Sequence, residues 1–161
     1  MPPTTRPTKP ESSRGFPPIA DARAHVLILG SLPGRVSLER RQYYALPQNT
    51  FWKIMGALVG ATPQLSYPQR TKKLLENRIA LWDVCAEAER SGSMDKDILR
   101  STIVPNDFAA FLRTHAQIGK ICCNGSEAAR LFRRLVLPST SPAHAAMSFD
   151  EKLLRWRVIL S

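Results

Sequence analysis

The sequence lacks any apolar run near the roughly 20 residues that a helix needs to span a bilayer. Its first residues, MPPTTRPTKPESSRGFPP, contain no apolar stretch of the kind found in secretory signal peptides. We therefore expect a cytoplasmic protein that is not bound to a membrane.

Cysteine is scarce, with three residues, Cys85, Cys122 and Cys123, in a chain of 161. Each lies in an apolar run and none belongs to a C-x-x-C pair, which favours buried, reduced thiols. No pattern of cysteine and histidine resembles a structural zinc site or an iron–sulfur site. We therefore expect no metal and no cofactor.

The common nucleotide-binding motifs are also missing. A glycine-rich turn, GSLPG at residues 30–34, follows an apolar run, and such turns can hold phosphate. However, the chain has neither the G-x-x-x-x-G-K-[ST] spacing with its lysine nor G-x-G-x-x-G. Binding of a free nucleotide of these kinds is therefore disfavoured.

Acidic residues are few, with 13 Asp and Glu against 23 Lys and Arg, which gives a net charge of +10. This charge favours a polyanionic partner, either nucleic acid or an anionic surface, although a basic surface without a partner is also compatible. Residues 1–18 are rich in Pro, Ser, Thr and Arg and are expected to form a disordered basic tail. Residues 19–161 suit a single domain.

Apolar runs and helical patterns alternate along the rest of the chain. Continuous apolar runs, typical of strands that are buried on both faces, lie at residues 25–29, 79–85, 118–123 and 135–137. The segments between them contain helical apolar spacing and capping signals, such as Ser66 with Gln69 and Ser148 with Glu151. This order predicts a three-layer α/β/α sandwich around a central, mainly parallel four-stranded sheet.

Ligands of such sheets bind beyond the carboxyl ends of the strands. The segments expected at that end are residues 30–49, 85–98, 124–126 and 138–144, all of which we expect to be loops. The candidate functional residues therefore converge in space although they are distant in sequence.

Two segments at this end resemble a known family. One runs from GSLPG to QYYALPQNTFW at residues 42–52, and the other is LPSTSPAHA at residues 137–145, followed by K-L-x-x-W at residues 152–156. Together they resemble the uracil-DNA glycosylase superfamily, most closely its family 6 branch, the hypoxanthine-DNA (deoxyinosine) glycosylases. The resemblance covers roughly residues 24–160. It independently implies the α/β/α sandwich.

The resemblance implies a monofunctional DNA repair glycosylase. Such an enzyme flips a deaminated base, chiefly hypoxanthine, out of duplex or single-stranded DNA and hydrolyses its N-glycosidic bond without a cofactor. A uracil- or mismatch-directed glycosylase of the same superfamily is one alternative, and a non-catalytic DNA-binding module on this fold is another. We further expect a monomer associated with the nucleoid.

Three residues of the first motif receive roles from the resemblance. Asn49 matches a catalytic Asn in P-x-N-x-F-W, where its amide can orient water and the base, although a helix cap is the alternative. Tyr44 matches an aromatic residue that stacks on the flipped base, although it can also simply pack the loop. Leu32 stands where many members carry Asp, Asn or Glu, and this difference favours the deoxyinosine-directed branch.

The remaining candidates contact the base or the DNA backbone. The residues expected near the base, besides Tyr44 and Leu32, are Ser31, Gly34 and Asp95. The residues expected to contact DNA are Ser139, Ser141, His144, Arg35 and Arg41. A solvated carboxylate at Asp95 and solvated arginines are the simpler alternatives.

Overall fold

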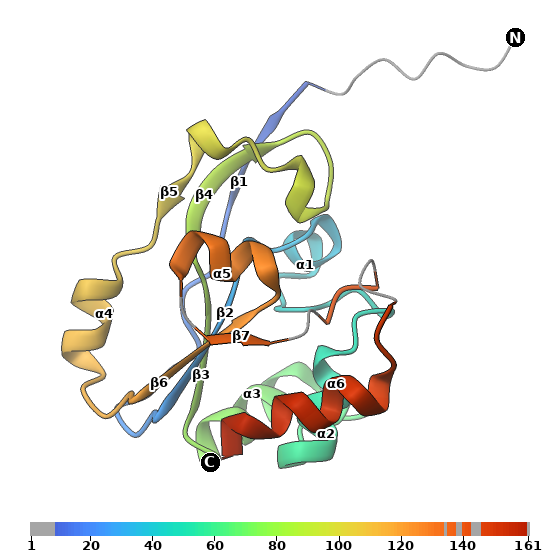
Figure 1. The fold of residues 1–161 in the computed structure, drawn as a ribbon, viewed down its shortest axis with the longest axis vertical. Coiled ribbons are helices and arrows are strands. Elements are labelled where there is room, and N and C mark those ends of the chain that lie inside the picture. Colours follow the sequence, from blue (N-terminus) through green and yellow to red (C-terminus); the bar gives the residue numbers. More distant parts are fainter. Residues whose placement is uncertain (1–8, 134, 138–139, 143–145, 161) are drawn as a thin grey trace, which may run out of the picture.

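The computed structural model describes residues 9–133, 135–137, 140–142 and 146–160. Its centre is a parallel four-stranded sheet with the strand order β3-β2-β6-β7 (Figure 1). The strands are β2 (Val26–Gly30), β3 (Ile79–Asp83), β6 (Lys120–Asn124) and β7 (Leu135–Leu137). The predicted α/β fold around a parallel four-stranded sheet is confirmed.

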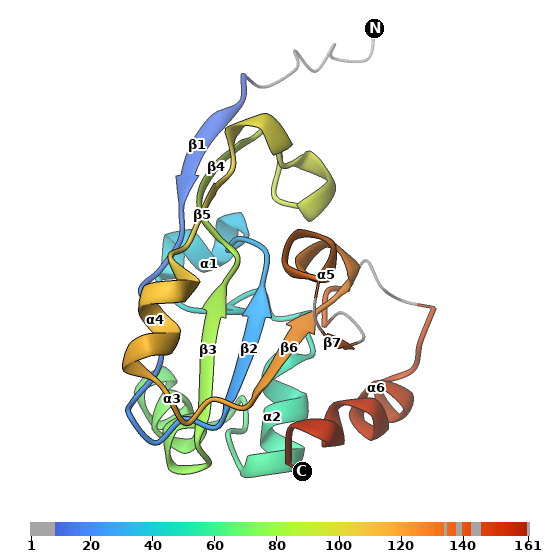
Figure 2. The same ribbon diagram turned by 60° about the vertical axis from the view of Figure 1, so that its left-hand side comes forward.

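Helices cover both faces of this sheet, because successive strand residues point to opposite sides. Ile28 and Leu81 belong to the core on one face, and Leu29 and Trp82 belong to the core on the other. Figure 2 shows helices on both sides of the sheet. The helices on the first face are α2 (Phe51–Val59), α3 (Tyr67–Glu76) and α6 (Phe149–Trp156), and those on the second are α4 (Phe108–Thr114) and α5 (Ser126–Phe132). These are the three predicted layers.

The predicted helix starts at Ser66 and Ser148 are confirmed. Each serine accepts a hydrogen bond from the backbone of the third helical residue, and the side chain of that residue bonds back to the serine N–H. These two reciprocal bonds satisfy amides that have no partner inside the helix. The capping boxes therefore fix where α3 and α6 begin.

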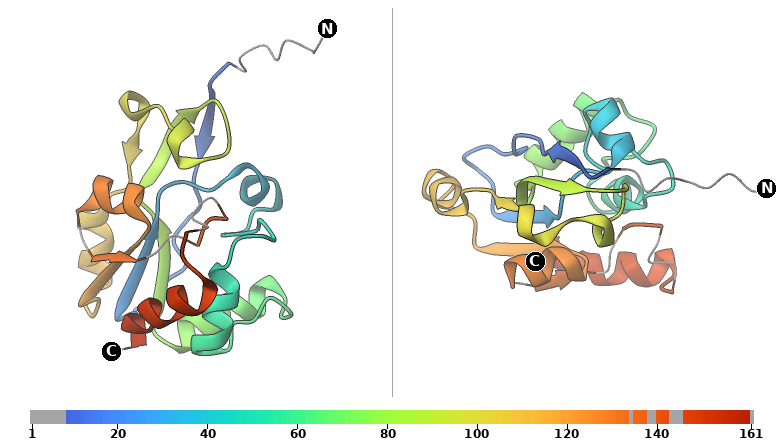
Figure 3. Two further views of the ribbon diagram at one scale, coloured as in Figure 1. Left: turned by 45° about the vertical axis from the view of Figure 1, so that its right-hand side comes forward. Right: turned by 90° about the horizontal axis from the view of Figure 1, so that it is seen from above.

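A second, antiparallel sheet lies beyond the carboxyl ends of the main strands (Figure 3). Its strands, in the order β1-β4-β5, are β1 (Glu11–Arg14), β4 (Cys85–Arg90) and β5 (Val104–Pro105). Two short 3₁₀ helices, η1 (Asp95–Asp97) and η2 (Arg100–Thr102), connect β4 to β5, and a third, η3 (Arg157–Leu160), follows α6. Because β4 follows β3 after one residue, the second sheet continues from the main one.

This second sheet corrects two expectations. Residues 85–90 form a strand rather than a loop, and residues 11–14 pair with them instead of belonging to a disordered tail. Ser12 Oγ donates to the Glu87 carboxylate at 2.7 Å, and the Phe16 ring packs edge-on against Tyr43 with centroids 5.1 Å apart. This polar strand is held by backbone pairing with β4, so its sequence has no apolar pattern that would predict a strand. Residues 1–8 lie outside the described residues.

The segment after the first glycine turn is also not the loop we expected. It contains α1 (Arg35–Arg40), a helix of six residues whose one fully buried residue is the polar Ser37. The Ser37 hydroxyl accepts the N–H of Ala45 at 3.1 Å, which fastens the helix to the following loop. A helix without an apolar stripe gives no helical periodicity to detect.

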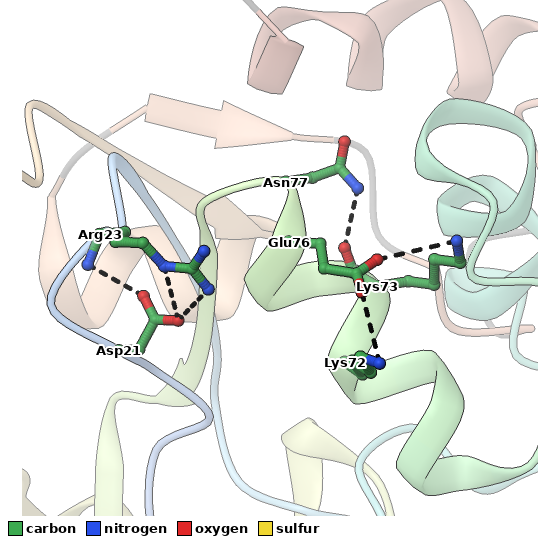
Figure 4. Close-up of polar contacts among 6 residues, drawn as sticks. All are labelled: Asp21, Arg23, Lys72, Lys73, Glu76 and Asn77. Atoms are coloured by element: carbon green, nitrogen blue, oxygen red, sulfur yellow. Dashed lines mark hydrogen bonds and ion pairs between the residues drawn. The ribbon is translucent and has the colours of Figure 1, made fainter.

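Surface ion pairs gather around α3, near the amino ends of the main strands (Figure 4). Lys72 and Lys73 approach the Glu76 carboxylate to 3.8 and 3.7 Å, and Asp21 pairs with Arg23 at 2.7 Å. Exposed pairs of this kind contribute about 0–1 kcal/mol each to stability. None of the described helices is long and apolar enough to cross a membrane.

Candidate active site

Polar side chains meet where the three central strands end. Gly30, Asp83 and Asn124 are the last residues of β2, β3 and β6, and Gly30 is directly paired with Asp83. Asp83 and Asn124 are only 4% and 7% exposed, and Ser31, the next residue after β2, is 5% exposed. Buried polar groups at this edge are typical of a ligand site in a parallel sheet.

Thr140 joins the second motif to this edge. Its N–H donates to Asn124 Oδ1 at 3.0 Å, and Asn124 Nδ2 donates to its hydroxyl at 3.0 Å. The Thr140 carbonyl accepts the N–H of Thr50, also at 3.0 Å. Thr50 is adjacent to Asn49, so these bonds hold the two motifs against each other.

Asn49 lies at the start of α2 and is half-buried. Its Oδ1 accepts the N–H of Phe51 at 2.9 Å, and its own N–H donates to the Leu46 carbonyl at 2.9 Å. By backbone geometry the N-cap residue of α2 is Thr50, so Asn49 supports the first turn of the helix without being its N-cap. The bond to Phe51 fixes the direction of the Asn49 amide. The catalytic role stays a prediction.

The Tyr44 ring stacks on Phe51, with centroids 4.1 Å apart and planes 25° apart. The residue is half-exposed, whereas its hydroxyl is buried and has no hydrogen-bond partner among the described residues. Asn124 lies beside the hydroxyl without completing a bond to it. Burial, and then the Asp83 carboxylate, raise the pKa of this phenol. Tyr44 therefore packs the loop on one side, and base stacking stays a prediction.

Asp83 has the most unusual environment of the site. Burial and, to a smaller extent, the nearby Asp95 raise the pKa of its carboxyl group to about 7, against the opposing effect of Arg90. A Cβ atom added to Gly30 would lie 2.5 Å from Asp83 Oδ1 and 2.8 Å from the Tyr44 hydroxyl. Only glycine leaves room for these two groups at the end of β2.

Asp95 contacts the first motif through Ser31. Ser31 Oγ donates to Asp95 Oδ2 at 3.1 Å. Asp95 is exposed as a residue, yet protein atoms around its carboxyl group desolvate it and raise its pKa, which the Ser31 bond partly offsets. The buried Arg90 donates through Nη2 to the Pro33 carbonyl. The glycine turn is thus tied to β4 and to η1.

Comparison with known proteins identifies the family. The sequence profile of the uracil DNA glycosylase superfamily matches residues 17–159. The chain belongs to this superfamily. The expected membership is confirmed.

The relatives within the superfamily cover most of the chain. A hypoxanthine DNA glycosylase of Methanosarcina acetivorans is 38% identical over 144 residues, which are 84% of this chain and 90% of the relative. A hypoxanthine DNA glycosylase of Methanosarcina barkeri is 34% identical over 142 residues, 88% of this chain and 83% of the relative. A solution NMR structure of a Methanosarcina acetivorans protein matches with a TM-score of 0.75 and 33% identity, covering 94% of this chain and 100% of the other.

One predicted base contact, Leu32, has a buried side chain. The Leu32 side chain is 6% exposed and packs with Cys85, Ala88 and Ile98 in an apolar cluster below the second sheet. An apolar side chain at this position gains more from the core than from a polar site edge. The Leu32 side chain therefore belongs to the core, and its contact with the flipped base stays a prediction.

The remaining predicted site residues that the structure describes lie near the site or on the surface, and their contacts with the base or DNA stay predictions. Gly34 approaches Ser93, since a Cβ on Gly34 would lie 3.2 Å from Ser93 Oγ, which also accepts the N–H of Arg35 at 2.8 Å. Arg35 and Arg41 are exposed at the two ends of α1, and their phosphate contacts stay predictions. Ser141 is half-buried next to Thr140, while Ser139 and His144 lie outside the described residues. Within the described ranges, no group of three or more Asp, Glu, His or Cys is arranged to hold a metal ion.

Sequence reasoning missed four residues of this superfamily site. They are Asp83, Arg90, Asn124 and Thr140, and all are at most 7% exposed. A carboxylate at the end of an apolar strand, as in IALWD, and an amide at the end of another, as in KICCN, are the signals that could have revealed two of them. Arg90 and Thr140 could not have been recognised from sequence, because only tertiary contacts place their side chains at the site.

Proposed function

We propose that this protein is a DNA glycosylase that hydrolyses the N-glycosidic bond of deaminated nucleotides, chiefly deoxyinosine. The observation that carries the proposal is the similarity to two hypoxanthine DNA glycosylases, each over more than four fifths of this chain. The basic net charge of +10 suits a DNA substrate. We expect the protein to act as a monomer on DNA at the nucleoid.

The reaction requires a flipped nucleotide at the polar end of the sheet. Flipping costs a few kcal/mol of unstacking and unpairing, and less for a mispaired base. The exposed part of the Tyr44 ring offers a stacking surface, and its position on Phe51 holds the ring rigid. Stacking on an aromatic side chain contributes about 1–3 kcal/mol per base, which offsets much of that cost.

Bond cleavage makes the sugar positive and the departing base negative. A site that accelerates it positions water at the sugar and presents hydrogen-bond donors to the base. Leu32 provides no water-activating group at its motif position, because its side chain has no polar atom and is packed in the core. Asn49 is the first-motif residue that we propose to orient water, and its bond to Phe51 pre-positions the amide.

The proposal is tested with end-labelled duplexes that contain hypoxanthine, uracil or xanthine at one position. After incubation with the protein, alkali cleaves the strand wherever a base has been removed. We expect cleavage at hypoxanthine, and we expect duplex binding to weaken steeply with salt. Cleavage at uracil alone would support the uracil-directed alternative, and binding without any cleavage would support the non-catalytic module.

A further inference from the structure

Unpaired buried polar atoms are concentrated at the proposed base site. Among the described residues, four buried side-chain N or O atoms have no hydrogen-bond partner: Tyr44 Oη, Asp83 Oδ2, Arg90 Nη1 and Arg70 Nε. Arg70 lies on α3, where its guanidinium covers the Trp52 ring at 4.6 Å. The other three belong to one electrostatic cluster at the carboxyl end of the main sheet.

Leaving these groups unpaired destabilises the fold. Each buried donor or acceptor without a partner costs about 1–3 kcal/mol, so folded proteins rarely keep one without a ligand or another use for it. Asp83 Oδ1 and the Tyr44 hydroxyl both lie within 2.8 Å of the point where a Gly30 Cβ would be. The Asp83 carboxylate and the Tyr44 hydroxyl therefore both pack against Gly30 at the end of β2, and Asp83 lies next to the predicted stacking residue.

The chemistry of a departing purine decides which protonation state of Asp83 would assist cleavage. When the C1′–N9 bond breaks, its electron pair passes to the base, and negative charge spreads over the ring nitrogens and O6. A carboxylate beside that charge would oppose cleavage, whereas a neutral carboxylic acid can donate to it. The carboxyl group of Asp83 is largely desolvated, which favours its neutral form.

We propose that Asp83, in its protonated form, donates a hydrogen bond and then its proton to N7 of the flipped hypoxanthine as the base departs. The base leaves neutral, protonated on N7. Water adds to C1′ and supplies the new hydroxyl group, and the proton released from that water returns through solvent to the Asp83 carboxylate. The step rests on the proposed function and assigns its general acid.

Several groups around Asp83 can influence its titration. They are Tyr43 and Tyr44 in the first-motif loop, Cys85 and Arg90 on β4, and Asp95 in η1. Burial raises the pKa of the Cys85 thiol to about 12 and raises the pKa of both phenols above their usual range. Asp83, with a pKa of about 7, is therefore the member of this group expected to change charge near neutral pH, and the pKa of Asp95 is raised as well.

The test is the pH dependence of single-turnover excision of hypoxanthine from a labelled duplex, measured with excess protein between pH 5 and 9. For the wild-type protein we expect a constant rate at low pH and a tenfold fall per pH unit above a midpoint near or above 7. Asp83→Asn keeps a hydrogen-bond donor but cannot titrate, so its rate should be lower at pH 6 and independent of pH. Asp83→Ala should be slower still.

Two further variants separate Asp83 from its surroundings. Asp95→Asn removes a charge that raises the pKa of Asp83, so the midpoint should move to lower pH while the fall is retained. Glu89→Gln changes an exposed carboxylate of β4 and should leave the whole profile unchanged. Circular dichroism melting of each variant confirms that it is folded.

The outcomes distinguish this inference from the proposed function. A wild-type protein that excises no hypoxanthine would overturn the proposed function and this step with it. Excision with a pH profile that Asp83→Asn leaves unchanged would overturn the general acid alone. A profile that Asp95→Asn flattens and Asp83→Asn does not would assign the titrating group to Asp95 instead.

Discussion

Asn124 and Thr140 bind each other through two reciprocal hydrogen bonds, one from backbone to side chain and one between side chains, both 3.0 Å long. The pair connects the end of β6 to the second motif, and the Thr140 carbonyl continues the connection to Thr50. Because Thr50 is adjacent to Asn49, this buried pair positions the predicted catalytic amide.

Removing the Thr140 hydroxyl should therefore affect both stability and excision. In Thr140→Val the shape is kept, but Asn124 Nδ2 loses its acceptor in a buried site, which costs about 1–3 kcal/mol of unfolding free energy. We expect a matching loss in urea denaturation and slower excision of hypoxanthine. Thr140→Ser keeps the hydroxyl and is the control, so equal effects of Val and Ser would contradict this explanation.

The two roles of Asn49 can be separated by substitution. Asn49→Asp keeps an oxygen that can accept the N–H of Phe51, so the first turn of α2 should keep this support and the melting temperature should change little. It loses the NH₂ donor and adds a charge, and excision should fall at least 100-fold, by analogy with the removal of a preorganised donor. Asn49→Ala should lose both functions.

The matched control for Asn49 is Asn77→Ala. Asn77 is an exposed residue at the end of α3 whose Nδ2 donates to the Lys73 carbonyl at 2.8 Å (Figure 4). This variant should excise hypoxanthine at the wild-type rate. If Asn49→Ala retained full excision as well, Asn49 would only support the first turn of α2.

The ring and the hydroxyl of Tyr44 have different expected effects. Tyr44→Phe removes a buried hydroxyl that has no partner among the described residues, so unfolding free energy should stay the same or rise. Tyr44→Leu removes the stacking surface, and affinity for a duplex with an abasic-paired or mispaired hypoxanthine should fall roughly 5- to 150-fold, the equivalent of about 1–3 kcal/mol. Equal affinities for Leu and Phe variants would exclude base stacking.

Asp83 should make stability depend on pH. Its pKa in the folded chain is about 7, above the value of 3.8 for an unperturbed Asp, so the folded state binds this proton more tightly. Unfolding free energy should therefore decrease as the pH rises from about 4 to 7 and stay low above that range. The penalty amounts to roughly 4 kcal/mol for a shift of this size.

Asp83→Asn removes this penalty. Urea denaturation at pH 8 should show the variant to be more stable than the wild-type protein, while at pH 4 the two should be similar. A variant that is more stable and less active is typical of a group retained for function at the expense of the fold. If the two proteins differed in unfolding free energy by the same amount at pH 4 and pH 8, a group other than Asp83 would account for the pH dependence.

The apolar pattern was sufficient to predict the main sheet, but it missed the second. Residues 26–30 and 79–83 are continuously buried, so their composition carries the strand signal directly. Strand β1 has the sequence ESSR and depends on pairing with β4, a contact about 75 residues away in sequence, as between Ser12 and Glu87. Helix α1 buries the polar Ser37, so it has no apolar stripe.

The site was predictable where it follows a linear motif. Asn49 and Tyr44 were found because their neighbours form a recognisable pattern, and both lie near the carboxyl end of the main sheet. Asp83 was not found because IALWD reads as one apolar strand, and only the burial of its last residue marks it. Asn124 and Thr140 are partners on either side of α5 and β7, and a pair of this kind is not visible in a single sequence.

Strand β1 also limits how the chain can be shortened. The superfamily profile begins to match at residue 17, after β1 has ended at Arg14. A protein trimmed to that boundary would keep its whole family region but would leave one edge of β4 without its partner. Exposed strand edges recruit strands from other molecules. The short polar strand ESSR is therefore the edge that this sheet presents, in place of the longer strand β4.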